Sequence, residues 1–342
     1  MKFSGSPKKC TRSRVLLCWL TLVVSLFASG QSADDVHVVP RRQAPDHDSV
    51  GDAVSITPLP PPNLHRNAFH VSVDLVLVPV DVNDSMNRPV LSLRKEDFSL
   101  FDDGHQQLIS YFSHEDAPTS VAILFDVSKS MTEKTESERT ALVEFFKNAN
   151  PEDEYFGIAF SSRPRLLTDP DQSIEEIEQK LTDVQPGGAT AMLDAVYLAI
   201  SELRRARYER RAIVIISDGG DNASRYTLKQ IKALVQESDV QIYAVGLFET
   251  FFFNNFEEKM GKRWLSEITD ATGGRTITVD DRSKLAEATG EISRAIRSQY
   301  VLGYRAPQGA SSRWRKIKVK VLASAYHYRL KTHYKTGYMT AE

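Results

Sequence analysis

The sequence predicts an α/β fold, in which a doubly wound, mainly parallel sheet is inserted in or flanked by a small β-sandwich-like unit. Two observations lead to this prediction. Between residues 117 and 298, short continuous apolar runs alternate with segments of helical periodicity, as in a sheet covered by helices on both faces. Residues 66–116 and 299–342 instead alternate apolar and polar side chains, which is typical of half-buried strands.

The first thirty residues (1–30) have the features of a signal peptide. Basic residues precede an apolar run over 15–28, and the small residues 28–30 suit cleavage before Gln31. The run is shorter than the about 20 residues of a membrane span, so an uncleaved anchor is the alternative. Both cysteines, Cys10 and Cys18, lie in this segment. We therefore expect a bacterial protein that is secreted or periplasmic (cell envelope) and has no disulfide.

Residues 31–65 are rich in proline and lack apolar periodicity, so we interpret them as a disordered or semi-extended linker.

Residues 1–30 hold five Lys/Arg and no Asp/Glu, so their removal makes the formal net charge of −2 more negative by five. Such an acidic chain argues against nucleic acid as a partner, because phosphate binding requires a basic surface.

The segment 66–116 is too small a sheet to fold alone, because it would expose much of its apolar face. The segment 299–342 offers three more strand-like runs, at 300–304, 315–323 and 326–334. We predict that the two segments pair into one sandwich that receives the central domain as an insertion. Two independent β extensions are the alternative.

In the central segment 117–298, the elements follow in alternating order. The predicted strands are 120–125, 155–160, 165–168, 212–217, 240–246 and 275–279, and the predicted helices are 136–148, 174–182, 191–207, 228–238, 262–271 and 284–298. In such a sheet, ligands bind beyond the carboxyl ends of the strands, where the strand order reverses.

Polar oxygen donors follow two of these strands and precede one helix. Asp126 directly follows the first strand, with Ser128 and Ser130 after it; Thr190 precedes the third helix; and Asp218 follows the strand 212–217. Carboxylate and hydroxyl oxygens suit a hard cation, and Mg²⁺ or Mn²⁺ prefers such ligands in near-octahedral geometry. Helix caps and a structural ion or water are the simpler interpretation of the same residues.

This three-loop combination resembles the von Willebrand factor type A domain and its metal-ion-dependent adhesion site (MIDAS). The resemblance implies a sheet with Rossmann strand order and a metal bound by Asp126, Ser128, Ser130, Thr190 and Asp218. It also implies an open coordination position that an Asp or Glu of a protein partner fills. Motifs in the flanks, among them 95–98, 103–104 and 299–304, are similar to a bacterial, secreted subfamily of related proteins.

Further residues are candidates for supporting roles around this site. Asp194 and Asp221 are candidates to bind the metal indirectly, through a water or a ligand hydroxyl, although a helix start and a turn also explain them. Phe251, Phe252 and Phe253 follow the strand 240–246 and are candidates for ligand contact, while packing against the β unit is the interpretation that we favour.

Enzyme and nucleotide-binding functions receive little support. The segment 117–298 contains no histidine and no cysteine, so neither can act there as base or nucleophile. The sequence has neither a phosphate-binding P-loop nor a Gly-x-Gly-x-x-Gly motif after a strand. We therefore do not expect the protein to bind a nucleotide. Metal-assisted phosphoester hydrolysis, with Asp221 or Asp194 as base, is the remaining enzymatic alternative.

The sequence thus favours a non-enzymatic adhesion or scaffolding module that binds an acidic group of a protein partner through a divalent cation. A structural or assembly protein, in which the metal only stabilises the fold, is the main alternative.

Overall fold

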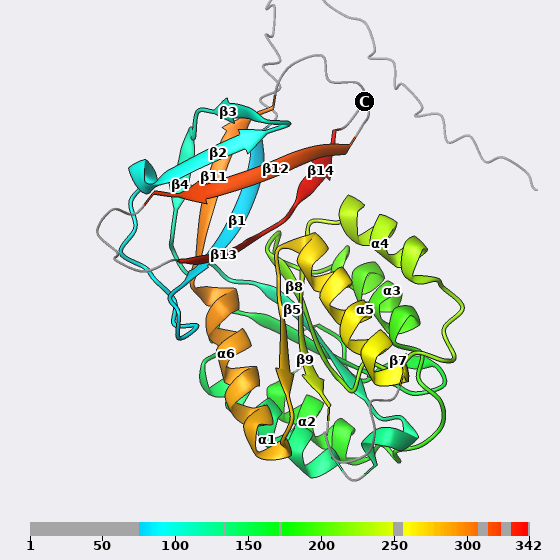
Figure 1. Ribbon diagram of the computed structural model, residues 1–342. Helices are drawn as coiled ribbons and strands as arrows, with labels where there is room; N and C mark the ends of the chain where they lie inside the picture. The colour runs from blue at the N-terminus through cyan, green and yellow to red at the C-terminus, as the bar shows by residue number, and fades with distance from the viewer. Residues whose placement is uncertain are drawn as a thin grey trace, which may run out of the picture. The chain divides into compact units, whose positions relative to one another are not determined.

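The computed structural model describes residues 75–132, 134–170, 173–248, 256–306, 314–322 and 330–340 (Figure 1). The predicted signal, the linker and the three phenylalanines 251–253 lie outside the described residues. The boundaries of the predicted segments stay predictions.

The central domain is built on a six-stranded sheet in the order β10-β9-β8-β5-β6-β7. Its strands are β5 (Ser120–Asp126), β6 (Glu154–Phe160), β7 (Pro164–Leu166), β8 (Arg211–Ser217), β9 (Val240–Leu247) and β10 (Thr276–Val279). All neighbours are parallel except β7, which runs antiparallel to β6 at the edge.

Helices cover both faces of this sheet (Figure 1). They are α1 (Thr135–Lys147), α2 (Ile174–Thr182), α3 (Met192–Leu203), α4 (Leu228–Glu237), α5 (Phe256–Thr272) and α6 (Leu285–Arg297). Alternate residues of β5 explain its continuous apolar sequence. Ile123 packs in a core with α1, α2 and α6, whereas Leu124 packs in a second core with α3, α4 and α5.

Two further sheets, each of four antiparallel strands, form the sandwich-like unit, in the orders β13-β1-β11-β4 and β14-β12-β2-β3. The strands are β1 (Leu75–Asn83), β2 (Phe98–Asp102), β3 (His105–Gln107), β4 (Tyr111–Ser113), β11 (Gln299–Arg305), β12 (Trp314–Val321), β13 (Lys331–Tyr334) and β14 (Gly337–Met339). Strand β1, which precedes the central domain, pairs with β11, which follows it. Both sheets contribute to one apolar core. The predicted fold class, α/β with a small sandwich-like unit, is confirmed.

The sandwich core contains a buried ionic group. The guanidinium of Arg315 contacts Asp102 at 2.8 Å, and the hydroxyls of Tyr304 and Tyr338 donate to the same carboxylate at 3.1 Å. A buried carboxylate is tolerated when cations and hydrogen-bond donors surround it, as these three side chains do here.

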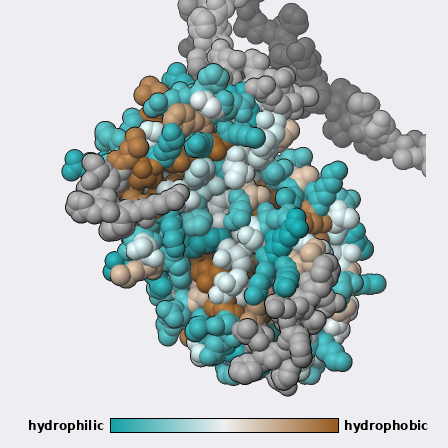
Figure 2. All heavy atoms as spheres, in the orientation of Figure 1, coloured by the Kyte–Doolittle hydropathy of each residue, from teal (hydrophilic) through white to brown (hydrophobic). Residues whose placement is uncertain are grey.

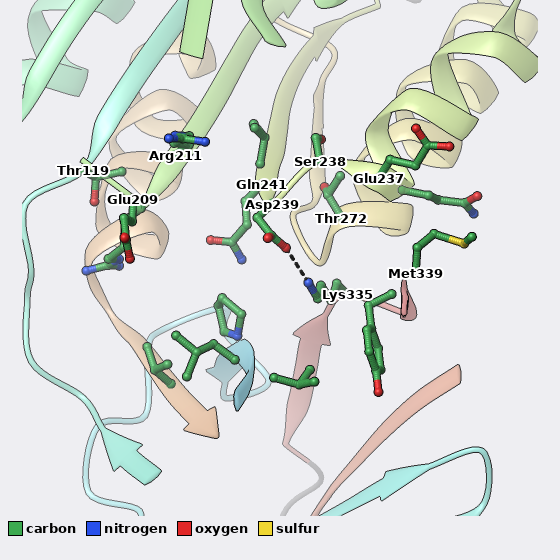
Figure 3. A pocket seen from close by; sticks show the side chains of 18 of the residues that line it. Thr119, Glu209, Arg211, Glu237, Ser238, Asp239, Gln241, Thr272, Lys335 and Met339 are labelled. Atoms are coloured by element: carbon green, nitrogen blue, oxygen red, sulfur yellow. Dashed lines mark hydrogen bonds and ion pairs between the residues drawn. The ribbon is translucent and has the colours of Figure 1, made fainter. Parts of the chain in front are cut away.

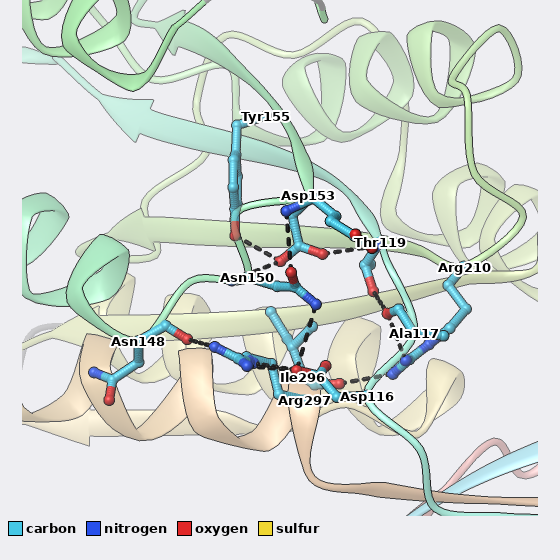
Figure 4. A network of polar contacts seen from close by, with 11 residues as sticks. Asp116, Ala117, Thr119, Asn148, Asn150, Asp153, Tyr155, Arg210, Ile296 and Arg297 are labelled. Carbon is cyan, nitrogen blue, oxygen red and sulfur yellow. Dashed lines mark hydrogen bonds and ion pairs between the residues drawn. The ribbon is translucent and has the colours of Figure 1, made fainter.

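A polar network joins the places where the chain enters and leaves the central domain (Figure 4). Arg297, at the end of α6, contacts Asp116, which precedes β5, with Nε 2.8 Å from the carboxylate. Arg210 donates to the carbonyl oxygens of Ala117 and Ile296, at 2.8 and 2.9 Å. Arg210 thus links the segment before β5 to the end of α6.

Contacts between the sandwich and the central domain lie near the amino ends of the parallel strands. Arg275, just before β10, forms an ion pair of 2.8 Å with Asp81 of β1, and Lys335 forms one of 2.8 Å with Asp239. A cavity of about 620 Å³ lies at this junction, lined in part by β1 and by the start of β9 (Figure 3). The carboxyl ends of the parallel strands lie at the other edge of the sheet.

Most of the exposed large apolar side chains in the described residues belong to the sandwich segments (Figure 2). They are Leu75, Leu77, Met86, Leu91, Leu108, Tyr111, Leu322 and Met339, while the central domain contributes Val143, Leu166 and Tyr197. No helix within the described ranges has the length and apolarity that crossing a membrane requires.

Several element ends differ from the sequence prediction. Helix α3 ends at Leu203 and not at Arg207, because the chain turns there and Arg210 bonds to the segments before β5 and after α6. Helix α5 begins at Phe256, six residues before the predicted start. The apolar periodicity shows only the part of a helix that faces the core, so a polar first turn is missed.

Candidate metal-binding site

The predicted ligands lie where the strand order of the central sheet reverses. From β5, the chain first adds β6 and β7 on one side, and it later adds β8, β9 and β10 on the other side. Asp126 is the last residue of β5, and Asp218 follows the last residue of its neighbour β8. The two carboxylates therefore emerge side by side at the edge where open α/β sheets bind ligands.

The first loop fixes the carboxylate of Asp126 and brings two hydroxyls together. The backbone N–H of Ser128 donates to Oδ1 of Asp126 at 3.0 Å, and the hydroxyl of Ser217 donates to Oδ2 at 2.6 Å. The Oγ atoms of Ser128 and Ser130 are 3.1 Å apart. Adjacent ligand oxygens around an octahedral ion with bonds of 2.0–2.1 Å are separated by about 3 Å, so this spacing suits Mg²⁺.

The second loop is held against the first by backbone hydrogen bonds. Gly187 N donates to Val127 O at 2.8 Å, and Lys129 N donates to Gly188 O at 3.1 Å. Gly188 has a φ of +86°, and a Cβ there would lie 2.7 Å from the hydroxyl of Ser162. A glycine is thus required at this position.

The third loop is bound to the second through Thr190. The side-chain oxygen of Asn222 accepts from Thr190 N at 2.9 Å, and the carbonyl of Thr190 accepts from the backbone N–H groups of Asn222 and Ala223. A Cβ placed on Gly220 would lie 3.5 Å from Oδ1 of Asp218 and 3.8 Å from Oγ1 of Thr190. Both oxygens therefore border the same space.

Burial of the candidate ligands decreases from one side of the site to the other. Asp126, Ser128 and Thr190 are buried, Asp218 is half-buried and Ser130 is exposed. A cation held by these groups would be reached from solvent on the side of Ser130 and Asp218.

The site concentrates negative charge in a poorly solvated place. Burial, and next the neighbouring charge of Asp218, raise the pKa of the Asp126 carboxyl to about 6, against the hydrogen bonds from Ser128 and Ser217. Burial and the charges of Asp126 and Asp218 also raise the pKa of Glu138, in α1, well above its usual value. A bound cation would offset this accumulation of carboxylates.

Asp194 and Asp221, the candidates for indirect metal binding, form hydrogen bonds within the loops. Asp194 accepts from Arg225 N, Tyr226 N and Arg225 Nε, and so holds the segment before α4 against α3. Asp221 accepts from Leu193 N at 2.8 Å and from the hydroxyl of Ser224 at 2.7 Å. Both carboxylates thereby fix the third loop relative to the start of α3. Thr190 lies just before this helix.

Sequence reasoning missed four residues that shape the site: Ser217, Asn222, Lys134 and Glu138. Ser217 and Asn222 flank the predicted ligand loop, so their polar side chains next to Asp218 were an available signal. Lys134 and Glu138 gave none, because a charged pair four residues apart at a helix start is ordinary on an exposed helix.

The donor set fits a hard divalent cation. Two carboxylates and three hydroxyls are all oxygen groups, and the three loops that carry them are bonded to one another. No group of three or more His, Cys, Asp or Glu within the described segments is placed to hold a metal ion. A cation here would therefore depend on the serine and threonine hydroxyls. The assignment of individual ligands stays a prediction.

Part of the central domain matches a known family. Residues 121–220 match the family description of the von Willebrand factor type A domain. The resemblance seen in the sequence is thus confirmed for the central domain.

Two curated relatives are similar to parts of the chain. An uncharacterised protein of Borreliella burgdorferi is 25% identical over 204 residues, which are 53% of this chain and 60% of the relative. Inter-alpha-trypsin inhibitor heavy chain H4 of Bos taurus is 28% identical over 129 residues, or 32% and 14%. The chain therefore spans less than two thirds of the length of either relative.

Two solved structures are similar to parts of the chain. A von Willebrand factor type A protein from Catenulispora acidiphila has a TM-score of 0.46 at 13% identity, covering 74% of this chain and 71% of the other. Proximal thread matrix protein 1 from the mussel byssus, with a zinc-occupied MIDAS motif, has a TM-score of 0.43 at 18% identity, covering 57% and 49%.

Proposed function

We propose that this chain is a non-enzymatic adhesion or scaffolding protein that docks a protein partner through a divalent cation, Mg²⁺ or Mn²⁺. The cation is held by Asp126, Ser128, Ser130, Thr190 and Asp218. An Asp or Glu of the partner completes its coordination. The protein acts outside the cytoplasm, as the predicted signal and linker suggest.

The observation that carries the proposal is the hydrogen-bonded junction of the three loops at the strand-order reversal. This junction brings two carboxylates and two hydroxyls to one edge of the sheet. The two hydroxyl oxygens, of Ser128 and Ser130, are 3.1 Å apart. Neutral hydroxyl ligands leave much of the charge of a divalent ion uncompensated, so an anionic ligand is favoured at the exposed side. When bound, the cation supplies this residual positive charge, and the loops fix the position at which an anionic ligand meets it.

The position of the sandwich supports a docking role. Its described contacts with the central domain, such as Arg275 with Asp81 and Lys335 with Asp239, lie near the amino ends of the strands. The predicted metal loops are at the carboxyl ends. These contacts therefore leave the metal edge accessible to a partner.

A second function, in which the cation only stabilises the fold, is favoured by the burial of Asp126, Ser128 and Thr190. A buried ion that binds only the native state also raises stability by mass action, by about 2.7 kcal/mol at a hundredfold excess over Kd. The two functions differ in whether a partner depends on the metal.

The test combines metal titration with partner capture. Isothermal titration calorimetry with Mg²⁺ and Mn²⁺ on the wild type and on Asp126→Ala measures the metal site. Capture from envelope extract is then run with metal, with chelator, and with Asp126→Ala, and Asp183→Ala serves as the control because Asp183 is an exposed residue after α2.

We expect the wild type and Asp183→Ala to retain the same partners in metal, and both chelator and Asp126→Ala to release them. Recovery of identical partners in every arm, together with metal-dependent thermal stability, would instead establish the structural role.

A further inference from the structure

A buried lysine lies against one of the proposed metal ligands. The side chain of Lys134, at the start of α1, is only 11% exposed, and its Nζ lies 3.6 Å from Oδ2 of Asp218. This distance is an ion pair and is too long for a hydrogen bond. The ammonium group therefore neutralises Asp218 without being firmly held by it.

One helical turn further along α1 is a carboxyl group with no hydrogen-bond partner in the described residues. Glu138 is fully buried, and neither of its carboxyl oxygens is bonded. Buried polar atoms without partners are rare in native proteins, and each calls for a physical explanation. The backbone N–H of Glu138 donates to the carbonyl of Lys134 at 3.0 Å, so the two side chains are neighbours at positions i and i+4.

We propose that Lys134 exchanges partners when the cation binds, leaving Asp218 for Glu138, so that Glu138 is the positioning residue that receives the displaced ammonium. This inference rests on the proposed function, because it requires Asp218 to become a metal ligand.

The charges explain why both residues are needed. Without metal, the ammonium of Lys134 partly offsets the carboxylates of Asp126 and Asp218, which would otherwise repel each other. A divalent cation takes over this role and repels the ammonium. A buried ammonium left without a carboxylate is costly, and Glu138, within one turn, supplies one. Lys134 is thus an internal competitor of the metal, and Glu138 lowers the cost of displacing it.

The test is calorimetric titration of Mg²⁺ and Mn²⁺ into four full-length proteins: wild type, Lys134→Met, Glu138→Gln and the double variant. We expect Glu138→Gln to weaken metal binding by about tenfold or more, as for other residues that support metal ligands. We expect Lys134→Met to bind the metal as tightly as wild type or more tightly. The double variant should recover the affinity of Lys134→Met, because no ammonium remains to be displaced.

Matched controls are Glu136→Gln, an exposed carboxylate in the first turn of the same helix, and Lys147→Met, an exposed lysine at its end. Each changes the net charge as the test variants do, and each should leave metal affinity within about twofold of wild type, because exposed charges are screened.

A second measurement follows Lys134 in the wild-type protein itself. In wild-type protein labelled with ¹⁵N at the lysine side chains, the Lys134 ammonium resonance, assigned with Lys134→Arg, should move on addition of Mg²⁺. An unchanged resonance in metal-saturated protein would overturn the exchange.

The outcomes separate this inference from the proposed function. Metal binding by wild type with equal affinity in Glu138→Gln, or equal losses in Lys134→Met and Glu138→Gln, overturns the lysine exchange and leaves the metal site intact. Absence of metal binding by the wild type overturns both.

Discussion

At the scale of single residues, the hydroxyl of Ser217 determines how Asp126 faces the site. It donates to Oδ2 of Asp126 at 2.6 Å and accepts from the backbone N–H of Gly219 at 2.9 Å. Ser217 therefore joins the carboxylate at the end of β5 to the loop that carries Asp218. Both contacts are buried, so neither group can exchange its bond for water.

Replacement of this hydroxyl tests its role. Ser217→Ala leaves one carboxylate oxygen and one N–H without a partner, so we expect the free energy of unfolding to fall by about 1–3 kcal/mol. Metal affinity should fall as well, because the carboxylate loses the bond that orients it. Urea unfolding and Mg²⁺ titration measure the two effects, and unchanged metal affinity in a folded variant would show that Ser217 has only a structural role.

At the scale of elements, the third metal loop depends on a close approach to α5. Gly219 has a φ of +79°, and a Cβ there would lie 2.8 Å from the backbone carbonyl carbon of Gly261 in α5. A Cβ on Gly261 would in turn lie 2.6 Å from the backbone C and O atoms of Gly219. Two glycines in distant segments thus allow the loop to lie against the helix.

This contact reverses the effect that replacing a helical glycine by alanine usually has on stability. Gly→Ala inside a helix normally adds up to about 1 kcal/mol of stability. At Gly261 the added methyl meets rigid backbone, so we expect Gly261→Ala to destabilise by about 1–3 kcal/mol and to weaken metal binding. Gly290→Ala in α6 is the matched control, because its nearest neighbour would be Cγ of Glu144 at 3.3 Å, a flexible side chain.

Thermal unfolding of the two alanine variants, each with and without Mg²⁺, measures the difference. If Gly261→Ala and Gly290→Ala changed stability equally, close packing of the third loop on α5 would be ruled out.

How far the sequence predicted these elements depends on the periodicity of each one. The strand 212–217 was predicted to within one residue of β8, because both faces of its sheet are covered and its sequence is continuously apolar. Helix α5 was predicted too short, because the sequence of its first turn is mainly polar and adds little to the apolar periodicity. The bonds from Ser217 and Asn222 depend on loop contacts between distant segments, which local sequence patterns do not encode.

At the scale of the whole molecule, Arg275 connects the sandwich with the central domain. It lies before β10, its NH1 is 2.8 Å from Asp81 of the sandwich strand β1, and its NH2 is 3.1 Å from Glu291 of α6. All three side chains are buried or mostly buried. Burial raises the pKa of Asp81 and of Glu291, against the charge of Arg275. The guanidinium of Arg275 is therefore the counterion of both Asp81, in the sandwich, and Glu291, in the central domain.

Removal of the Arg275 guanidinium should separate the unfolding of the sandwich from that of the central domain. Arg275→Met leaves Asp81 and Glu291 without their counterion, and breaking a buried ion pair from one side costs about 3–5 kcal/mol. Trp314 lies in the sandwich strand β12 and Trp264 in α5, so Trp264→Phe and Trp314→Phe, each combined with Trp19→Phe, report on each part by fluorescence. We expect the two urea midpoints to coincide with Arg275 in place and to differ in Arg275→Met.

Arg263→Met is the control, since Arg263 is 70% exposed and pairs with Glu267 on the surface, where an ion pair contributes at most about 1 kcal/mol. It should leave the midpoints together. Coincident midpoints in Arg275→Met as well would mean that apolar packing alone couples the sandwich to the central domain. In Arg275→Met, Mg²⁺ should raise the urea midpoint that Trp264 reports and leave the one that Trp314 reports unchanged, because the proposed ligands all belong to the central domain.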